Sequence, residues 1–253
     1  MSAPDLSPLF APRRIAVVGA SDTPGKLGTA MARSLESFGG APGRVALVNR
    51  RGGGFHRSIP HAAADGAIDL AILCVPAPAC PDLIDEAAEA GVGAVMVCSG
   101  GFAEVGGSAV ELQERLAERA IAAGVRLLGP NTSGFIDPRR DLTATFVPGV
   151  AAIPAGRIAV VAASGGVNHA LAFLLAEAGH GLSLGVGLGN AVDVDAPDVL
   201  DHLRGDADTT AVALHIESVR NGPRLIDAVS RLTPTVPVAV SYTHLTLPTI
   251  CSV

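Results

Sequence analysis

A glycine-rich turn near the start of the chain has the residue types of a phosphate-binding site. The turn follows the apolar run Arg14–Val18. Its candidate ligand-binding residues are Gly19, Ala20, Ser21, Lys26 and Gly28. A glycine at a strand end lets a ligand approach the backbone, and a helix that begins after the turn presents N–H groups and the positive end of its dipole. The spacing is not G-x-G-x-x-G, so the dinucleotide-binding fingerprint is not met, and a plain strand–helix turn remains an alternative.

Two arginines after the next apolar run, Arg44–Val48, bear on which ligand this turn would hold. The run continues into Asn49, Arg50 and Arg51. An NAD site places Asp or Glu at the end of this strand, where the carboxylate bonds the ribose hydroxyls, whereas arginines favour an extra phosphate. Coenzyme A carries a 3′-phosphate and NADP a 2′-phosphate, so either ligand would fit. A solvated turn is the alternative.

Two further strand ends are expected at the same carboxyl edge of the sheet, where open α/β sheets bind ligands. Val75 and Pro76 end the third apolar run, and Cys98, Ser99 and Gly100 end the fourth. These small residues could line a slot for an elongated ligand. We expect Cys98 to be an inert cysteine at a strand end, because no basic partner is near it in sequence.

A second turn of the same kind lies in the middle of the chain. Ser164, Gly165 and Gly166 follow the apolar run Arg157–Ala162 and precede a helix-like stretch. Their backbone N–H groups and the Ser164 hydroxyl could hold an anion. The motif G-x-S-x-G is absent, so we do not expect Ser164 to be a nucleophile.

The turn after the following strand adds polar groups to this second site. Asn190 could contribute to phosphate binding, and Asp193 and Asp195 follow it. Two carboxylates alone are a weak signal for a metal, and no metal site is predicted. Asp195 is explained equally well as a helix N-cap ahead of Pro197.

A single carboxylate ends the strand near residue 216. Glu217 directly follows the apolar run Ala211–Ile216, at the edge where the Ser-Gly-Gly turn is expected. A carboxylate in that place could hold a cationic or imidazole group. His215 lies inside the strand and is expected to be structural.

The apolar runs that end in these turns alternate with helix-like stretches. The runs cover 14–18, 44–48, 69–75, 93–98, 125–128, 157–162, 182–188, 211–216 and 236–240. Uninterrupted apolar runs are typical of strands buried on both faces of a parallel sheet, and the alternation predicts a doubly wound α/β fold. RRIAVVGAS at 13–21 is repeated as GRIAVVAAS at 156–164, which favours two similar α/β domains. One large sheet is the alternative.

Composition excludes several classes of protein. The 253 residues are 49% apolar and 17% charged, which is too apolar for a disordered chain. A net charge of −6 without a Lys/Arg run argues against nucleic-acid binding. No apolar run is long enough for a membrane span, and the N-terminus lacks the basic residues of a signal peptide, so we expect neither. The sequence has no CxxC pair, so we expect no zinc site and no disulfide framework. A cytoplasmic protein is predicted.

The last segment, 241–253, departs from the rest of the chain. Five of its 13 residues are Ser or Thr, and it holds the only tyrosine. It resembles translated adaptor sequence at the end of a truncated contig. We therefore expect the natural chain to continue differently after Val240, and His244 is not a candidate for chemistry.

Taken together, these segments resemble the NDP-forming acyl-CoA synthetases, which include the ADP-forming acetyl-CoA synthetases and the α subunit of succinyl-CoA synthetase. The resemblance runs from about Leu9 to Val240. It rests on GAS-x-x-P-G-K-x-G, the VN turn, VPAP, SGGF, LGPNTSG, ASGG, GLGN-x-x-D-V-D and the strand-end Glu217, in the family's order. It implies a Rossmann-like coenzyme A-binding domain over 8–135, a linker over 136–156 and an incomplete flavodoxin-like domain over 157–240.

The resemblance also implies roles for the candidate residues. The four turns of the first domain would bind coenzyme A, Ser164 to Gly166 would stabilise a phosphohistidine, and Glu217 would orient it. The family usually has Ser-x-Ser-Gly at the second site, where this chain has Ala-Ala-Ser-Gly. The family's histidine lies well beyond the glutamate, at or past the end of this chain.

The implied activity is that of an acid–CoA ligase acting on a small carboxylic acid. ATP or ADP with Mg²⁺ would be held by an ATP-grasp domain or subunit that this chain lacks. We expect the chain alone to bind coenzyme A without turnover. A non-catalytic module that binds coenzyme A or acyl-CoA, and an NADP-dependent oxidoreductase, are the alternatives.

Overall fold

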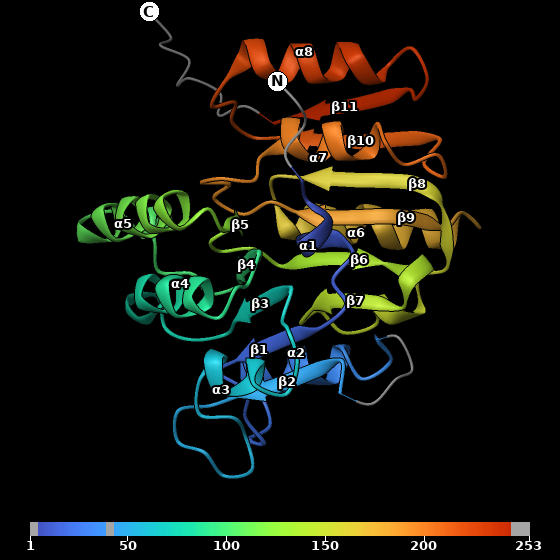
Figure 1. Ribbon diagram of the computed structural model, residues 1–253. Helices are drawn as coiled ribbons and strands as arrows, with labels where there is room; N and C mark the ends of the chain where they lie inside the picture. The colour runs from blue at the N-terminus through green and yellow to red at the C-terminus, as the bar shows by residue number, and fades with distance from the viewer. Residues whose placement is uncertain (1–4, 39–42, 244–253) are drawn as a thin grey trace, which may run out of the picture.

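The computed structural model describes residues 5–38 and 43–243, which form two sheets flanked by helices (Figure 1). The first sheet is fully parallel, with the strand order β2-β1-β3-β4-β5. The second has the order β11-β10-β8-β9-β6-β7 and is parallel except for β6, which runs antiparallel to β7 and β9. These sheets confirm the predicted α/β class.

The bounds of the elements follow the predicted alternation closely. The first half contains α1 (Ser7–Phe10), β1 (Ile15–Val18), α2 (Leu27–Ser34), β2 (Val45–Val48), α3 (Ile59–Ala63), β3 (Leu70–Leu73), α4 (Cys80–Glu89), β4 (Ala94–Val97), α5 (Ser108–Ala123) and β5 (Arg126–Leu128). The second half contains β6 (Gly134–Asp137), β7 (Leu142–Thr145), β8 (Ala155–Ala162), α6 (Gly165–Glu177), β9 (Leu182–Gly187), α7 (Ala196–Leu203), β10 (Ala211–Ile216), α8 (Gly222–Leu232) and β11 (Val238–Tyr242).

Burial explains why the central strands were readable from sequence. All four residues of β1, β3 and β4 are buried, as expected where helices cover both faces of a parallel sheet. Helices begin where local chemistry favours it: Ser58 caps α3, Asn221 caps α8, and Asp195 forms a capping box at α7. The N-cap prediction for Asp195 is therefore confirmed.

The segment predicted as a linker, 136–156, differs from that expectation. It contains the last two residues of β6, all of β7 and the first two residues of β8, and β6 and β7 complete one side of the second sheet. Its prolines, Pro138, Pro148 and Pro154, lie outside the paired residues of β6 and β7. Because prolines are typical of loops, they led us to predict a linker in place of these short strands. At the other end, β11 runs through Ser241 and Tyr242 of the segment predicted to be foreign, while 244–253 and His244 lie outside the described residues.

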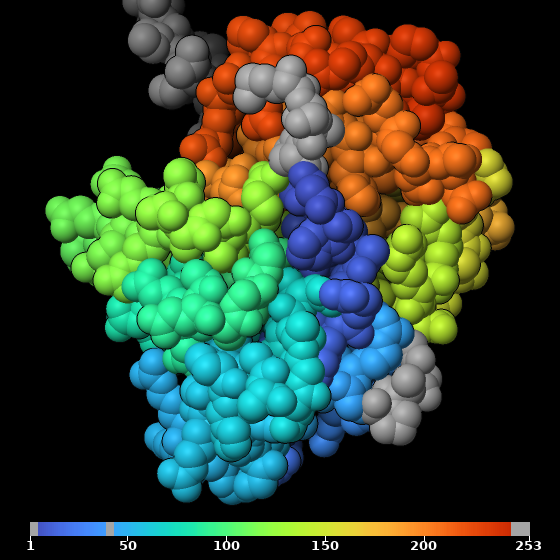
Figure 2. Space-filling view, in the orientation of Figure 1, coloured from blue at the N-terminus to red at the C-terminus, as the bar shows by residue number. Residues whose placement is uncertain are grey.

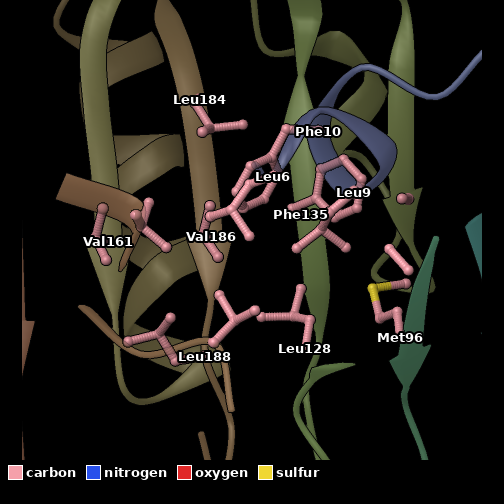
Figure 3. Packing of buried hydrophobic residues seen from close by; sticks show 14 of the residues in the cluster. Leu6, Leu9, Phe10, Met96, Leu128, Phe135, Val161, Leu184, Val186 and Leu188 are labelled. Atoms are coloured by element: carbon pink, nitrogen blue, oxygen red, sulfur yellow. The ribbon is translucent and has the colours of Figure 1, made fainter. Parts of the chain in front are cut away.

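One hydrophobic core joins the two sheets. Phe10 of α1 packs edge-on against Phe135 of β6, with ring centroids 5.3 Å apart. Figure 3 shows these rings among Leu184 and Val186 of β9 and Met96 of β4, so the same cluster touches both sheets. In Figure 2 the dark blue segment that contains α1 is seated between the two halves. The halves therefore share buried surface as well as a chain connection.

Within the described residues, no helix combines the length and the apolar character needed to cross a membrane.

Candidate functional site

The first crevice lies at the carboxyl edge of the five-stranded sheet. Because β2, β1, β3 and β4 are parallel, the turns that follow them meet there. They surround a cavity of about 570 Å³. The predicted residues that line it are Gly19, Ser21, Lys26, Gly28, Asn49, Arg50, Arg51, Val75, Pro76 and Ser99. The structure thus brings together most of the residues singled out at four separate points of the sequence.

Three of the predicted residues do not line this cavity. Ala20 is fully buried, and its carbonyl accepts a 2.7 Å hydrogen bond from Asn49 Nδ2. Cys98 is 6% exposed and belongs to the core. Gly100 lies close to the side chains of Asn131 and Glu104. These three residues adjoin residues that line the cavity but are not part of its lining.

Close backbone packing explains the glycine at the start of the turn. Gly19 has φ +91°, and a Cβ on it would lie 2.5 Å from the carbonyl oxygen of Cys74. A Cβ on Gly28, at the start of α2, would collide with the Gly19 backbone. The turn therefore runs directly between β3 and the helix. Lys26 occupies the N-cap of α2 without a side-chain hydrogen bond to the first turn, which leaves the end of the helix open to an anion.

The positive charge in the cavity comes from the segments that follow β1 and β2. Lys26, Arg50, Arg51 and Arg57 all line it. One carboxylate, Glu86 of α4, sits among them: it lies 3.8 Å from the guanidinium of Arg50 and accepts a hydrogen bond from the backbone of α3. Four cations against one carboxylate make this end of the crevice suited to phosphate groups.

Sequence reasoning missed Arg57, Glu86 and Cys74 in this lining. Arg57 comes after a loop with three consecutive glycines, Gly52 to Gly54, and returns to the crevice because His56 pairs with the end of β2. The basic residue just past the glycines was an available signal. Glu86 lies on a helix face that strand-end reasoning does not consider.

The second crevice lies at the carboxyl edge of β8, β9 and β10. Its cavity of about 220 Å³ is lined by Asn190, Asp195, His215, Glu217 and Arg220 among others. Glu217 is exposed there, as its position at a strand end predicts. Arg220 donates a hydrogen bond to the carbonyl of Ala191, which fixes the turn opposite Glu217. Ser164, Gly165 and Gly166 are not among the lining residues of this cavity.

The Ser-Gly-Gly turn does begin a helix. Ser164 is the N-cap of α6, and its Oγ accepts a 3.5 Å hydrogen bond from the N–H of Val167. In the first turn, His169 Nδ1 donates to the carbonyl of Gly165 at 2.6 Å, and its Nε2 lies 3.3 Å from Thr145 Oγ1 of β7. Burial lowers the pKa of His169 despite the opposing effect of the Gly165 carbonyl. A neutral imidazole thus anchors the start of α6 to the neighbouring strand.

Ser133 is a further polar residue at this helix start that sequence reasoning did not single out. Its Oγ is buried and has no hydrogen-bond partner among the described residues. It packs against the backbone of Gly165, where α6 begins, and a Cβ on Gly187 would lie 2.5 Å from it. Glycine at positions 165 and 187 leaves room for the Ser133 side chain. These two glycines were therefore an available signal in the sequence that another residue packs against this helix start.

Asn190 serves a contact that its predicted role as a phosphate ligand did not include. Its Nδ2 donates to Glu104 Oε2 at 2.6 Å and to Gln113 Oε1 at 2.7 Å, both in the first half of the chain. The other Glu104 oxygen accepts the backbone N–H groups of Gly101 and Phe102. Partial burial alone would raise the pKa of Glu104, but the hydrogen bonds from Asn190 and the two amides outweigh it and lower the pKa. One carboxylate therefore ties a turn of the first crevice to a turn of the second.

Backbone pairing strengthens the same junction. The segment 190–194 lies along the free side of β5, with Val192 N–H bonded to Gly129 O and Val194 N–H to Leu127 O, both at 3.1 Å. Asp193 in this segment accepts two hydrogen bonds from the Arg126 guanidinium, at 2.8 and 3.0 Å. The two crevices are therefore held in a fixed relation.

Comparison with known families identifies both halves. Residues 13–138 match the family described as a CoA binding domain, and residues 155–244 match the succinyl-CoA ligase like flavodoxin domain. A coenzyme A-binding domain followed by a succinyl-CoA ligase-like flavodoxin domain is thus the class of protein that the fold and the two crevices define.

Relatives narrow the assignment. The α subunits of the ADP-forming acetate–CoA ligases I and II of Pyrococcus furiosus are each 32% identical, over 93% and 90% of this chain and 52% and 50% of their own lengths. The structure of the dinucleotide-forming acetyl-coenzyme A synthetase 1 of Ca. Korarchaeum cryptofilum, in complex with phosphate and ADP, is 33% identical with a TM-score of 0.85, covering 94% of this chain and 51% of that one. The chain belongs to the NDP-forming acyl-CoA synthetase family. It spans about half the length of these relatives.

Proposed function

We propose that the chain is the coenzyme A-binding and phosphoryl-transfer portion of an acid–CoA ligase. The observation that carries this is the first crevice, where a glycine turn and the start of a helix lie beside four cations. Coenzyme A has a pyrophosphate and a 3′-phosphate at one end and an uncharged thiol-bearing arm at the other. The crevice has the matching division, with its cations after β1 and β2 and small apolar residues after β3.

The residue assignments follow that division. The turn from Gly19 to Gly28 would hold the pyrophosphate, because backbone amides and Lys26 are available there. Arg50 and Arg51 would contact the 3′-phosphate, with Arg57 as a further cation. The uncharged arm would pass Val75, Pro76 and Ser99 toward the second crevice. Ser99 and Val75 are joined by a hydrogen bond, which keeps the two turns together.

The second crevice would serve the phosphoryl step. In this proposal, acyl phosphate and coenzyme A are interconverted with acyl-CoA and phosphate, and a phosphohistidine carries the phosphoryl group to a nucleotide in an ATP-grasp domain or subunit. The start of α6 at Ser164 to Gly166 would offset the charge of the phosphorylated imidazole, and Glu217 would orient the ring. His169 already anchors α6, so it is not assigned as the carrier. The substrate is a small carboxylic acid.

Calorimetry with matched ligands tests the coenzyme A part. We expect coenzyme A to bind the chain more tightly than dephospho-coenzyme A, because only the former has the 3′-phosphate. The double variant Arg50→Ala/Arg51→Ala should remove this preference by weakening coenzyme A alone. The charge-matched control is Arg115→Ala/Arg204→Ala, which also deletes two exposed arginines, one on α5 and one at the end of α7, and it should keep the preference. Equal affinities for both ligands in the unmodified chain would refute the assignment of the arginines.

Two other outcomes separate the alternatives. Tight NADPH binding with none for coenzyme A would favour an oxidoreductase. Coenzyme A binding by the chain together with its ATP-grasp partner, but without formation of acyl-CoA from ATP and any small acid, would favour a non-catalytic binding module.

A further inference from the structure

Three cysteines lie together beneath the first crevice. Cys74 follows β3 and lines the cavity, Cys98 follows β4, and Cys80 begins α4; all three are free thiols. The strand register pairs Leu73 with Val97, so the next residues, Cys74 and Cys98, are neighbours on adjacent parallel strands. Neighbouring strands lie about 4.8 Å apart, within the roughly 4.4–6.8 Å between Cα atoms that a disulfide requires. Paired side chains of parallel strands also point to the same face of the sheet.

The three thiols differ in their access to solvent. Cys74 is partly exposed, whereas Cys80 is fully buried and Cys98 is 6% exposed. Burial raises the pKa of Cys80 to about 12. A hydrogen bond with Cys74, together with burial, raises the pKa of Cys98 well above its usual value. Cys74 is therefore the thiol that a reagent in the crevice meets first, and Cys98 is the thiol in contact behind it.

The crevice would deliver one kind of reagent to this pair. Its cations follow β1 and β2, whereas Cys74 follows β3, the next strand of the sheet after β1. A ligand with phosphates at one end and sulfur at the other would be drawn in by the cations and would direct its sulfur-bearing arm toward β3 and β4. A disulfide whose charges are carboxylates partly offset by ammonium groups is attracted less strongly.

We propose that Cys74 and Cys98 form a dithiol that a disulfide of coenzyme A oxidises from within the crevice; this rests on the coenzyme A binding proposed above. The Cys74 thiolate attacks one sulfur of the disulfide, which forms a Cys74–coenzyme A mixed disulfide and releases one coenzyme A thiol. The Cys98 thiol then loses its proton and attacks the Cys74 sulfur, which releases the second coenzyme A thiol and leaves a Cys74–Cys98 disulfide. In sum, two protein thiols are oxidised and one coenzyme A disulfide is reduced to two thiols.

The reverse reaction uses the same atoms. Excess coenzyme A thiol attacks the Cys74–Cys98 disulfide and regenerates the dithiol and coenzyme A disulfide. The state of the pair therefore follows the ratio of coenzyme A disulfide to thiol at the crevice where coenzyme A itself is proposed to bind.

The test compares coenzyme A disulfide with glutathione disulfide, on a parent chain carrying Cys251→Ser because Cys251 lies outside the described residues. Released thiols are counted by chromatography, and peptide mass spectrometry locates the new bond. The parent should release two coenzyme A thiols per chain and form the Cys74–Cys98 bond. Glutathione disulfide should react at least about tenfold more slowly, since its carboxylates, partly offset by its own ammonium groups, are attracted less strongly by the cations than the phosphates of coenzyme A disulfide.

Three single variants assign the steps. Cys98→Ser should stop after one released thiol, with coenzyme A attached at Cys74. Cys74→Ser should release none. Cys80→Ser removes the neighbouring thiol that is not paired in the register, so it is the matched control and should react like the parent. Circular dichroism of each variant confirms that the fold is retained.

Several results would overturn the proposal: modification at Cys80, equal rates with both disulfides, or complete reaction of Cys74→Ser. Calorimetry on the reduced parent separates this inference from the proposed function. If coenzyme A binds and no exchange occurs, only the dithiol proposal fails. If coenzyme A does not bind, the proposed function fails first.

Discussion

Replacing Gly19 with alanine tests how closely the turn of the first crevice lies on β3. The residue has φ +91°, and the new Cβ would lie 2.5 Å from the Cys74 carbonyl oxygen and 2.9 Å from Val75 Cγ1. Backbone strain of this kind costs about 1–3 kcal/mol. Displacing the backbone and side-chain atoms of the turn after β3 adds about 1–3 kcal/mol. We therefore expect the free energy of unfolding to fall by about 2–6 kcal/mol.

Gly124→Ala is the control for the strain alone. Gly124 ends α5 with φ +67°, and a Cβ added there would meet nothing within 4 Å, so only the backbone contribution of about 1–2 kcal/mol is expected. Urea unfolding followed by circular dichroism gives both values. If the two variants lose the same free energy of unfolding, the inference that the turn packs tightly against the residues after β3 is wrong.

The same pair of variants probes the ligand. A shift of the turn that costs about 1.4 kcal/mol of binding free energy weakens coenzyme A tenfold. Calorimetry should show at least this loss for Gly19→Ala and none for Gly124→Ala. Unchanged affinity in a folded Gly19→Ala variant would place the ligand away from the turn.

Three further outcomes concern the junction of the two halves. A double-mutant cycle of Arg126→Ala and Asp193→Ala should give a coupling of about 0.5–3 kcal/mol in urea unfolding, because both side chains are only 21% exposed and meet through two hydrogen bonds; additive losses would contradict this. Asp198→Ala should destabilise by about 1–3 kcal/mol, because this 2%-exposed carboxylate accepts the backbone N–H of Asp195, while its partner Arg224 is 42% exposed and can turn to water; an unchanged urea midpoint would refute it. Glu104→Gln should lose stability at neutral pH, where the lowered pKa of Glu104 keeps the carboxylate charged, and this difference should shrink as pH falls through that pKa in thermal melts; a deficit that does not change with pH would count against it.

The sequence predicted the elements whose residues are all buried and missed those defined by distant partners. β1, β3 and β4 were readable because every residue in them is apolar and buried. β6 and β7 were not, since they contain the polar residues Asp137, Thr143 and Thr145, which are buried by pairing that local patterns do not reveal.

The candidate site divides in the same way. Strand-end turns such as Val75-Pro76 and Asn49-Arg50 were predicted because parallel strands bring their carboxyl ends to one edge. The contact of Asn190 with Glu104 joins residues 86 positions apart, so no local spacing could indicate it. Cys74 was missed for a similar reason, because its proposed role depends on Cys98, which follows the adjacent strand and is distant in sequence.

The segment 190–194 has a practical consequence for dissecting the protein. It occupies the hydrogen-bonding groups of β5, the last strand of the first sheet, on the side that no other strand covers. A recombinant piece ending near residue 138 would leave that strand with bare amides and carbonyls and would uncover Phe135 and Leu128, which are fully buried in the whole chain. Exposed edges of this kind template pairing between molecules. Such a piece should self-associate on storage, and expression of both halves together is the sounder route to a well-behaved sample.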